Sequence, residues 1–255
     1  MNTNSKTREI LKMNQTIITE ITQGLTTAFI DHTVSSNLAY RPQFVSNNYK
    51  EGRKVISSIE DELLSCEQFA ISVAFITMSG ITPLLQTLKE LEKRGIPGRI
   101  LTTDYLTFSD PKALRKLEEF SNLHVKMYVT DQTEEGFHTK GYIFKKEEMY
   151  RIIVGSSNMT LSALTVNREW NTRIVSTEQG EYAQSVLTEF EDLWNSPQAI
   201  EFEQFIDSYT ENYTRNKIIR KQKELARQEQ IPSLEAYRLQ PNSMQTGFIN
   251  NLQKI

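Results

Sequence analysis

Hydrophobic and polar residues between about residue 50 and residue 194 alternate with two different periods. Short runs of mainly apolar residues, which are typical of buried strands, occupy residues 69–75, 99–103 and 125–129. Apolar residues at helical spacing occupy residues 55–64, 81–91 and 111–120, and Pro111 suits the first turn of the last of these helices. Because strand and helix alternate, the pattern predicts an α/β domain with a mixed or parallel sheet and helices on its faces.

The rest of the chain extends this pattern in both directions. Further strand-like runs lie at 137–144, 150–154 and 170–175, and a helix at 181–194 follows them. Apolar residues at helical spacing between residues 10 and 25 predict a helical N-terminal arm, which Gly24 would loosen near its end. A polar helical stretch covers 201–230, and its basic part is typical of a solvated helical face. We therefore expect three segments: a helical arm (1–50), the α/β domain (51–197) and a helical extension (198–255).

The composition favours a soluble cytoplasmic protein. The chain has 255 residues, of which 38% are hydrophobic and 24% charged, enough for a large α/β domain with its own core. Cys66 is the single cysteine, which excludes an internal disulfide framework. No apolar run approaches the ~18 residues of a membrane span, and the N-terminus does not resemble a signal peptide. The net charge of −3 does not indicate a nucleic-acid binder, although only the contacting face of such a protein must be basic.

Residues with catalytic potential are concentrated between residues 136 and 171. Side chains two apart in a strand point to the same face, so His138 and Lys140 are expected to project together. Ser156 and Asn158 would do the same if their strand continues through them. Glycines at positions 136, 141 and 155 would let a ligand or another backbone approach closely. Glu169 begins the next extended run.

These residue types suit phosphoryl transfer. An imidazole is a competent nucleophile and leaving group, and a carboxylate can orient its tautomer. An ammonium and a carboxamide can hold phosphate oxygens as charge builds up. The set requires no metal ion and no cofactor, and one cysteine with three scattered histidines gives no zinc-ligand spacing. We interpret His32 and His124 as ordinary residues, and Trp170 and Trp194 as core residues rather than base-stacking platforms.

The same residues resemble the HKD motif of the phospholipase D superfamily. His138-x-Lys140 followed by Gly155-Ser156-x-Asn158 matches the motif's pattern of histidine and lysine on one strand and Gly-Ser-x-Asn on the next. The resemblance implies a phospholipase-D-like fold, with a mixed sheet flanked by helices. It further implies that His138 attacks phosphorus and that the lysine, serine and asparagine hold the phosphate.

Two neighbouring positions bear on which branch of the superfamily the chain resembles. Nucleases of the superfamily add a glutamate shortly after the asparagine, and Glu169 stands in the expected place. The family's aspartate, five residues after the lysine, is replaced by Lys145. This replacement departs from the family's pattern but suits the nuclease branch, where the glutamate can orient His138 instead.

From about residue 69 to residue 194 the chain resembles the phospholipase-D-like nuclease domain found ahead of superfamily 2 DEAD/DEAH-box helicases in bacteria. The runs that carry this resemblance are 73–80, 99–105, 155–158 and 167–171, and residues 239–245 resemble the lead-in to a helicase motor. No G-x-x-x-x-G-K-[ST] phosphate loop occurs in the chain. The resemblance implies a fragment or truncated product of a longer helicase-nuclease, with a role in bacterial antiphage defence or DNA processing.

The expected function is metal-independent cleavage of DNA through a phosphohistidine intermediate. This mechanism needs a second histidine, so a single motif per chain implies a homodimer that shares one active site, unless a further domain supplies the second half. Two alternatives stay open: a catalytically degenerate domain that binds DNA or a partner protein for a helicase, and a lipid phosphodiesterase. The sequence leaves open DNA or RNA as substrate, single or double strand, and the cleavage specificity.

Overall fold

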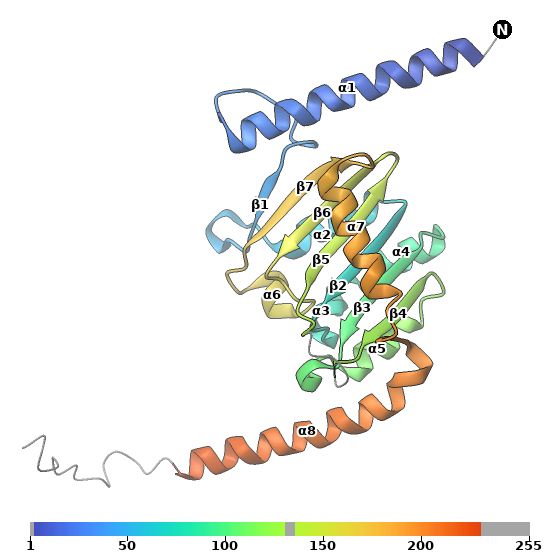
Figure 1. Ribbon diagram of the computed structural model, residues 1–255. Helices are drawn as coiled ribbons and strands as arrows, with labels where there is room; N and C mark the ends of the chain where they lie inside the picture. The colour runs from blue at the N-terminus through green and yellow to red at the C-terminus, as the bar shows by residue number, and fades with distance from the viewer. Residues whose placement is uncertain (1–2, 131–135, 231–255) are drawn as a thin grey trace, which may run out of the picture. The chain divides into compact units, whose positions relative to one another are not determined.

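The computed structural model describes residues 3–130 and 136–230, with side chains between residues 15 and 225 of these ranges. They form an eight-stranded sheet in the order β1-β7-β6-β5-β2-β3-β4-β8 (Figure 1). The strands are β1 (Gln43–Val45), β2 (Gln68–Val73), β3 (Gly98–Thr103), β4 (Leu123–Tyr128), β5 (Lys140–Lys146), β6 (Met149–Gly155), β7 (Asn171–Thr177) and β8 (Ala199–Glu201). The α-helices are α1 (Thr3–Phe29), α2 (Val55–Ser65), α3 (Met78–Ile81), α4 (Leu85–Lys93), α5 (Pro111–Glu118), α6 (Leu161–Thr165), α7 (Glu181–Trp194) and α8 (Phe202–Gln230). The predicted mixed sheet with flanking helices is confirmed.

The sheet combines a parallel half and an antiparallel half. β2, β3 and β4 are parallel because α4 and α5 return the chain to the same end between them. β5, β6 and β7 form an antiparallel meander, and β5 pairs antiparallel with β2 to join the two halves. The short strands β1 and β8 form the two edges.

Helices bury both faces of this sheet. α2, α4 and α5 cover one face, where Ile59, Leu91 and Leu117 are completely buried. α7 crosses the other face, where Ala183 and Phe190 are buried against the sheet (Figure 1). Each large apolar side chain buried in this way stabilises the fold by roughly 1.5–3 kcal/mol. The sheet is therefore a packed scaffold for the residues that lie at its ends.

The strand registers bring the ends of four strands to one place. The last residue of β2, Val73, lies opposite the first residue of β5, Lys140. The last residue of β6, Gly155, lies opposite the first residue of β7, Asn171. Since β5 and β6 are neighbours, the loops that precede β5 and β7 and follow β2 and β6 meet at a single end of the sheet.

A buried ion-pair cluster ties α2 to the antiparallel half. The carboxylate of Glu62 on α2 lies 2.9 Å from the guanidinium of Arg173 on β7 and 3.5 Å from that of Arg151 on β6. Burial raises the pKa of Glu62, and the two arginines oppose this shift. The cluster holds the β6 and β7 strands against α2 because a carboxylate buried to this degree needs charged partners.

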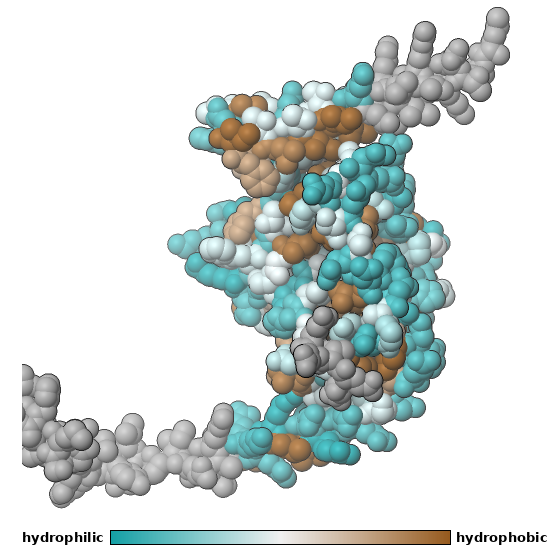
Figure 2. Space-filling model, in the orientation of Figure 1, coloured by the Kyte–Doolittle hydropathy of each residue, from teal (hydrophilic) through white to brown (hydrophobic). Residues whose placement is uncertain are grey.

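The N-terminal segment contains a strand that the hydrophobic pattern did not predict. β1 pairs with β7 and so joins this segment to the sheet. The prediction that Gly24 loosens the first helix is wrong, since α1 continues to Phe29. A Cβ at position 24 would lie 2.7 Å from the carbonyl oxygen of Tyr40, so the glycine allows the following loop to approach the helix. Figure 2 shows apolar side chains gathered along α1, where Ile18 and Phe29 are more than half exposed.

The C-terminal part of the sheet includes a second strand that was not predicted, β8, which pairs with β4. The first turns of α8 also belong to the core, since Phe205, Ile206 and Tyr209 are buried there. The chain divides into a compact unit, Met1–Tyr213, and a second unit, Thr214–Ile255, which is helical as far as Gln230. The division at residues 50 and 197 stays a prediction, and the helicase-like run at 239–245 lies outside the described residues.

Candidate functional site

His138 and Lys140 lie together where the chain enters β5. The strand begins at Lys140, so the prediction of a strand that begins at residue 137 is wrong. His138 lies in the loop that precedes the strand. Lys140 Nζ is 2.8 Å from Nδ1 of the His138 ring and donates to the His138 carbonyl oxygen at 2.7 Å. The ring of Phe75, just beyond β2, meets the imidazole edge to face with 6.0 Å between ring centroids. The lysine ammonium and the aromatic ring thus fix the imidazole at the sheet end.

The charges at this site disfavour a protonated imidazole. Partial burial, and then the neighbouring Lys140 ammonium, lower the pKa of His138 below its usual value. Partial burial also lowers the pKa of Lys140, while the carboxylate of Glu169 opposes that shift. A neutral imidazole has the free nitrogen lone pair that a nucleophile needs.

Ser156 and Asn158 point to different partners. β6 ends at Gly155, so the expectation that both side chains share one face of a continued strand is wrong. The Ser156 hydroxyl donates to the Glu169 carboxylate, and the Trp170 N–H donates to the same hydroxyl oxygen. Asn158 Oδ1 accepts a hydrogen bond from the Phe75 N–H at 3.1 Å. Because its oxygen is held by the backbone, the Asn158 amide is oriented with its NH₂ group as the remaining donor.

Glu169 lies just before β7 and binds Ser156 rather than His138. Within the described residues, no hydrogen bond joins Glu169 to the imidazole. Its charge nevertheless acts on the Lys140 ammonium, so the carboxylate belongs to the same cluster. The structure thus brings the five predicted site residues to one end of the sheet, with His138–Lys140 and Ser156–Glu169 as hydrogen-bonded pairs.

A buried hydrogen-bond network supports the loop after β6. Asn171 Nδ2 donates to the Ser157 hydroxyl at 2.9 Å and to the Val45 carbonyl at 3.1 Å. The Tyr142 hydroxyl donates to the Ser157 carbonyl at 3.0 Å. Sequence reasoning assigned no role to these residues, and the apolar surroundings that bury them appear only in the fold. They hold the segment that carries Ser156 and Asn158.

The position of the missing motif aspartate lies away from this cluster. Lys145 stands near the far end of β5, and its Nζ pairs with Glu178 Oε1 at 2.5 Å. Hydrogen bonding to Glu178 raises the pKa of Lys145. The side chain therefore belongs to a surface ion pair at the opposite end of the strand from Lys140.

An apolar cavity of about 470 Å³ lies beside His138. It is lined by the ends of β5 and β6, including Gly141 and Val154, and by Tyr182 and Val186 of α7. No group of three or more histidine, cysteine, aspartate or glutamate side chains suited to a metal ion occurs in the described part of the chain. His32 and His124, interpreted as ordinary from the sequence, are exposed.

Trp170 corrects the sequence interpretation. It was expected in the core, yet its side chain is 73% exposed, next to Glu169, whereas Trp194 is 8% exposed, as expected. Phe44 of β1 packs against the Trp170 ring with 5.8 Å between centroids. The exposure of this tryptophan depends on its place at the end of the sheet, which no local pattern reveals.

Comparison with known structures finds similar chains at low sequence identity. NucT from Helicobacter pylori and Nuc, a phospholipase D family member from Salmonella typhimurium, match 64% of this chain and 99% of their own, both with a TM-score of 0.49, at 15% and 18% identity. Phosphatidylserine synthase from Haemophilus influenzae matches 72% of this chain and 46% of its own, with a TM-score of 0.48 and 15% identity. A search of curated proteins finds no match.

No helix in the described part of the chain is long and apolar enough to cross a membrane.

The family of the chain follows from a match to a family model. The model of the family described as "Cardiolipin synthase, PLD-like domain" matches residues 61–194, more than half of the chain. The matched region contains all five candidate site residues and the strands that position them. The chain therefore belongs to this phospholipase-D-like domain family, and through it to the phospholipase D superfamily, whose members are in general phosphodiesterases and nucleases.

Proposed function

We propose that the chain is a metal-independent nuclease that cleaves DNA phosphodiesters through a phosphohistidine on His138. The observation that carries the proposal is the convergence of an imidazole, an ammonium, a hydroxyl, a carboxamide and a carboxylate at one sheet end. Four of these groups form two hydrogen-bonded pairs, and the carboxamide is oriented by a backbone N–H. These are the groups that phosphoryl transfer through a histidine requires.

In the first step, a nitrogen of His138 attacks phosphorus and the bond from phosphorus to the leaving oxygen breaks. A second histidine gives its proton to that oxygen, and the product is a phosphohistidine. Lys140 and the NH₂ group of Asn158 stabilise the charge on the non-bridging oxygens, and the Ser156 hydroxyl helps them. Glu169 orients His138 once the substrate displaces the contacts of the free site, since catalytic hydrogen bonds often tighten only in the complex.

In the second step, the second histidine takes a proton from water, which attacks phosphorus and releases His138. The chain carries one such motif, so we propose that the second histidine is His138 of the partner subunit in a homodimer. The exposure of His138 supports this arrangement, because an exposed residue is accessible to a second molecule. A helicase domain beyond this chain, with a role in bacterial antiphage defence or DNA processing, remains part of the proposal.

A lipid phosphodiester is the second candidate substrate. The matched family description names cardiolipin synthase, and the cavity beside His138 is lined mainly by apolar groups, which suit an acyl or glycerol group. DNA remains the preferred substrate because of Glu169, which stands where the nucleases of the superfamily carry a glutamate.

The test is a time course on plasmid DNA and on phosphatidylglycerol vesicles in excess EDTA. We expect cleavage of DNA in EDTA, no cleavage by His138→Ala, and an acid-labile, alkali-stable phosphate on the trapped wild-type chain. Activity that disappears in EDTA and returns with magnesium would refute the phosphohistidine mechanism. Cleavage of lipid alone would favour the second candidate, and binding of DNA without cleavage would favour the degenerate domain.

A mixing experiment tests the shared site. An excess of His138→Ala chains is combined with wild-type chains and allowed to exchange, and the activity per wild-type chain is measured. We expect activity to fall as heterodimers replace wild-type dimers. Full activity of each wild-type chain inside a heterodimer contradicts the shared site.

A further inference from the structure

Two aromatic side chains stand exposed beside the candidate site. Trp170 is 73% exposed and Phe44 is 56% exposed. Their rings meet at an interplanar angle of 82°, so this contact covers at most one face of the Trp170 indole. Large aromatic side chains bury most of their surface in folded proteins, and an exposed pair of them indicates a binding surface.

The backbone fixes this pair to the site. The Trp170 N–H donates to the Ser156 hydroxyl oxygen at 3.0 Å, and the Trp170 carbonyl accepts from the Ser156 N–H at 3.1 Å. Phe44 lies on β1, which pairs with β7 directly after Trp170. Whatever binds the indole therefore lies beside the group that we assign to the phosphate.

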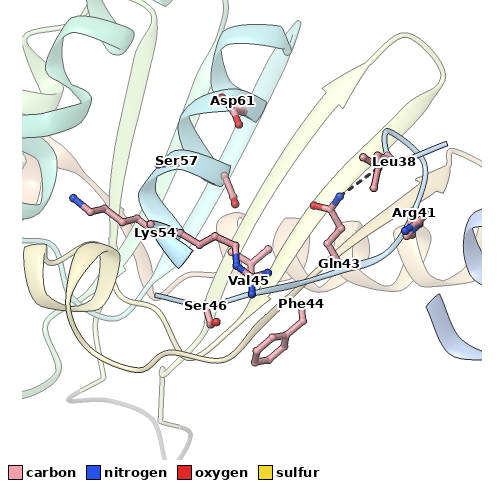
Figure 3. Close-up of a pocket in the computed structure, with 12 residues that line it drawn as sticks. Leu38, Arg41, Gln43, Phe44, Val45, Ser46, Lys54, Ser57 and Asp61 are labelled. Atoms are coloured by element: carbon pink, nitrogen blue, oxygen red, sulfur yellow. Dashed lines mark hydrogen bonds between the residues drawn. The ribbon is translucent and has the colours of Figure 1, made fainter. Parts of the chain in front are cut away.

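Three exposed cations lie on chain segments that neighbour the pair. The side chains of Lys50, Lys54 and Arg168 are exposed, and none forms an ion pair with a residue that the structure describes. Figure 3 shows Lys54 and Phe44 among the residues that line a hollow between β1 and the start of α2. The hollow has a volume of about 530 Å³, and Arg41, Arg53 and Asp61 also line it.

One asparagine joins the chain segments that carry these cations. Asn47 Nδ2 donates to the carbonyl oxygens of Ala163 and Asn167, and its Oδ1 accepts from the Val55 N–H at 2.9 Å. These bonds connect the loop that carries Lys50 and Lys54 to the turn that carries Arg168. The aromatic pair and the cations are thus parts of one supported surface.

We propose that Phe44, Trp170, Lys50, Lys54 and Arg168 form a stacking subsite for an unpaired segment of the nucleic-acid strand next to the scissile phosphate. This inference rests on the proposed function and adds the strandedness of its substrate. An unpaired base stacks on the open face of the indole, and the neighbouring phosphates meet the cations. A duplex cannot bind in this way, because its bases are stacked on each other and offer no free face.

Charge disfavours a second copy of the chain as the occupant. A two-fold contact through this surface would bring the exposed cations of one molecule close to those of the other. Like charges brought together at an interface cost affinity. A polyanion with exposed bases satisfies both the aromatic faces and the cations.

Tryptophan fluorescence gives a direct test, because the chain has two tryptophans and Trp194 is 8% exposed. The test uses the His138→Ala variant, which does not cut, and titrates it with a short oligothymidylate. We expect saturable quenching that is lost in His138→Ala combined with Trp170→Ala. The same change should weaken binding of a fluorescein-labelled oligonucleotide at least about fivefold, the lower end of what one base stack contributes.

Matched variants separate stacking from general effects. Leu64→Ala removes another exposed apolar side chain, which is 45% exposed and lies at the end of α2 that leads into β2, away from the site, and it should not change binding. Lys54→Ala should weaken binding and reduce its dependence on salt. A duplex of the same length should bind more weakly than the single strand and should not quench Trp170. If Trp170→Ala does not fold, two other measurements test the subsite. These are the fluorescence quenching of His138→Ala and the oligonucleotide binding of Trp170→Phe, which keeps a stacking ring.

Failure of the stacking subsite and failure of the proposed nuclease give different results. If His138→Ala shows the quenching but the wild-type chain cuts no DNA, the subsite stands and the proposed nuclease does not. If the wild-type chain cuts DNA while quenching is absent, or Trp170→Ala binds normally, the subsite is refuted. Three other outcomes also refute the subsite. They are equal quenching by a duplex, quenching by phosphatidylglycerol vesicles in place of the oligonucleotide, and a change from dimer to monomer in Trp170→Ala.

Discussion

Restoring the family's aspartate at position 145 tests whether its replacement has weakened the site, and we expect Lys145→Asp to leave activity unchanged. Lys145 is five residues from Lys140 along β5, which corresponds to roughly 17 Å at about 3.4 Å per residue. Its ammonium is bound to Glu178 and so belongs to the far end of the strand. A side chain in this position contacts none of the candidate catalytic groups.

The expected electrostatic effect is small. Two unit charges about 17 Å apart in water interact with an energy of roughly 0.2 kcal/mol. The change from +1 to −1 at position 145 therefore alters its interaction with a unit charge at the site by about 0.5 kcal/mol before screening. The distance exceeds the Debye length of ~10 Å at 0.1 M salt, and screening removes most of this energy. The kcat/KM for DNA should therefore change by less than about twofold.

Stability should respond more than activity. The Lys145–Glu178 pair is partly exposed, with side chains 29% and 43% accessible, and pairs of this kind contribute up to ~1 kcal/mol. The aspartate replaces this attraction with repulsion between two carboxylates. We expect the free energy of unfolding to fall by about 1 kcal/mol, and to fall less in Lys145→Met, which removes the attraction without adding repulsion.

The assay compares kcat/KM on DNA and urea unfolding for the wild type, Lys145→Asp, Lys145→Met and Lys140→Ala. Lys140→Ala is expected to reduce turnover by ~10²-fold or more, since it removes a donor to the transition state. A tenfold gain in Lys145→Asp would show that position 145 reaches the site and refute the reasoning. Activity found only in Lys145→Asp would identify the wild-type chain as the degenerate binding domain.

Three further predictions follow from the packing and charges of the site. The NMR titration of His138 should give a pKa below the ordinary histidine range, and Lys140→Met should move it upward, because removal of the ammonium favours the imidazolium; no movement would contradict the short contact between the two side chains. Glu62→Ala leaves two buried guanidinium groups without their carboxylate and should lower the free energy of unfolding by about 3–5 kcal/mol in urea titrations, whereas a loss under 1 kcal/mol would mean that the cluster is solvated. Gly155→Ala places a Cβ against the backbone that precedes β7 and should destabilise by roughly 1–3 kcal/mol, while Gly141→Ala, where a Cβ meets nothing within 4 Å, should not.

The hydrophobic pattern predicted the interior of this fold well because its strands and helices are long enough to show a period. The helix at 181–194 was predicted at the residues that α7 occupies, and the strands at 99–103 and 125–129 overlap β3 and β4 closely. β1 and β8 were missed because three residues cannot display a period of two. Their pairing with β7 and β4 is a tertiary fact that supplies the edges of the sheet.

Within the site, the sequence could identify which residues gather but not which atoms meet. The spacing of His138 and Lys140 predicted neighbours, and they are neighbours, although through a loop rather than a strand. Ser156 and Asn158 have the same spacing and turn to different partners, because β6 ends at Gly155. Side chains two residues apart share a face only within a strand. The strand ends where its backbone hydrogen bonds end, and these bonds depend on the neighbouring strand.

The contacts of the free site suggest how substrate would activate it in the proposed mechanism. The Lys140 ammonium lies against Nδ1 of His138, and the Ser156 hydroxyl donates to Glu169, so the groups assigned to the phosphate are bound to one another. A phosphate carries negative charge that a neutral imidazole lacks, and it therefore competes for the Lys140 ammonium. In the proposed mechanism the Ser156 hydroxyl turns from the Glu169 carboxylate to the phosphate as well. When both donors turn to the phosphate, Nδ1 and the carboxylate each lose a partner. A protonated Nδ1 can then donate to Glu169, and the other ring nitrogen is left with the lone pair that attacks phosphorus. In this view the substrate itself selects the reactive tautomer.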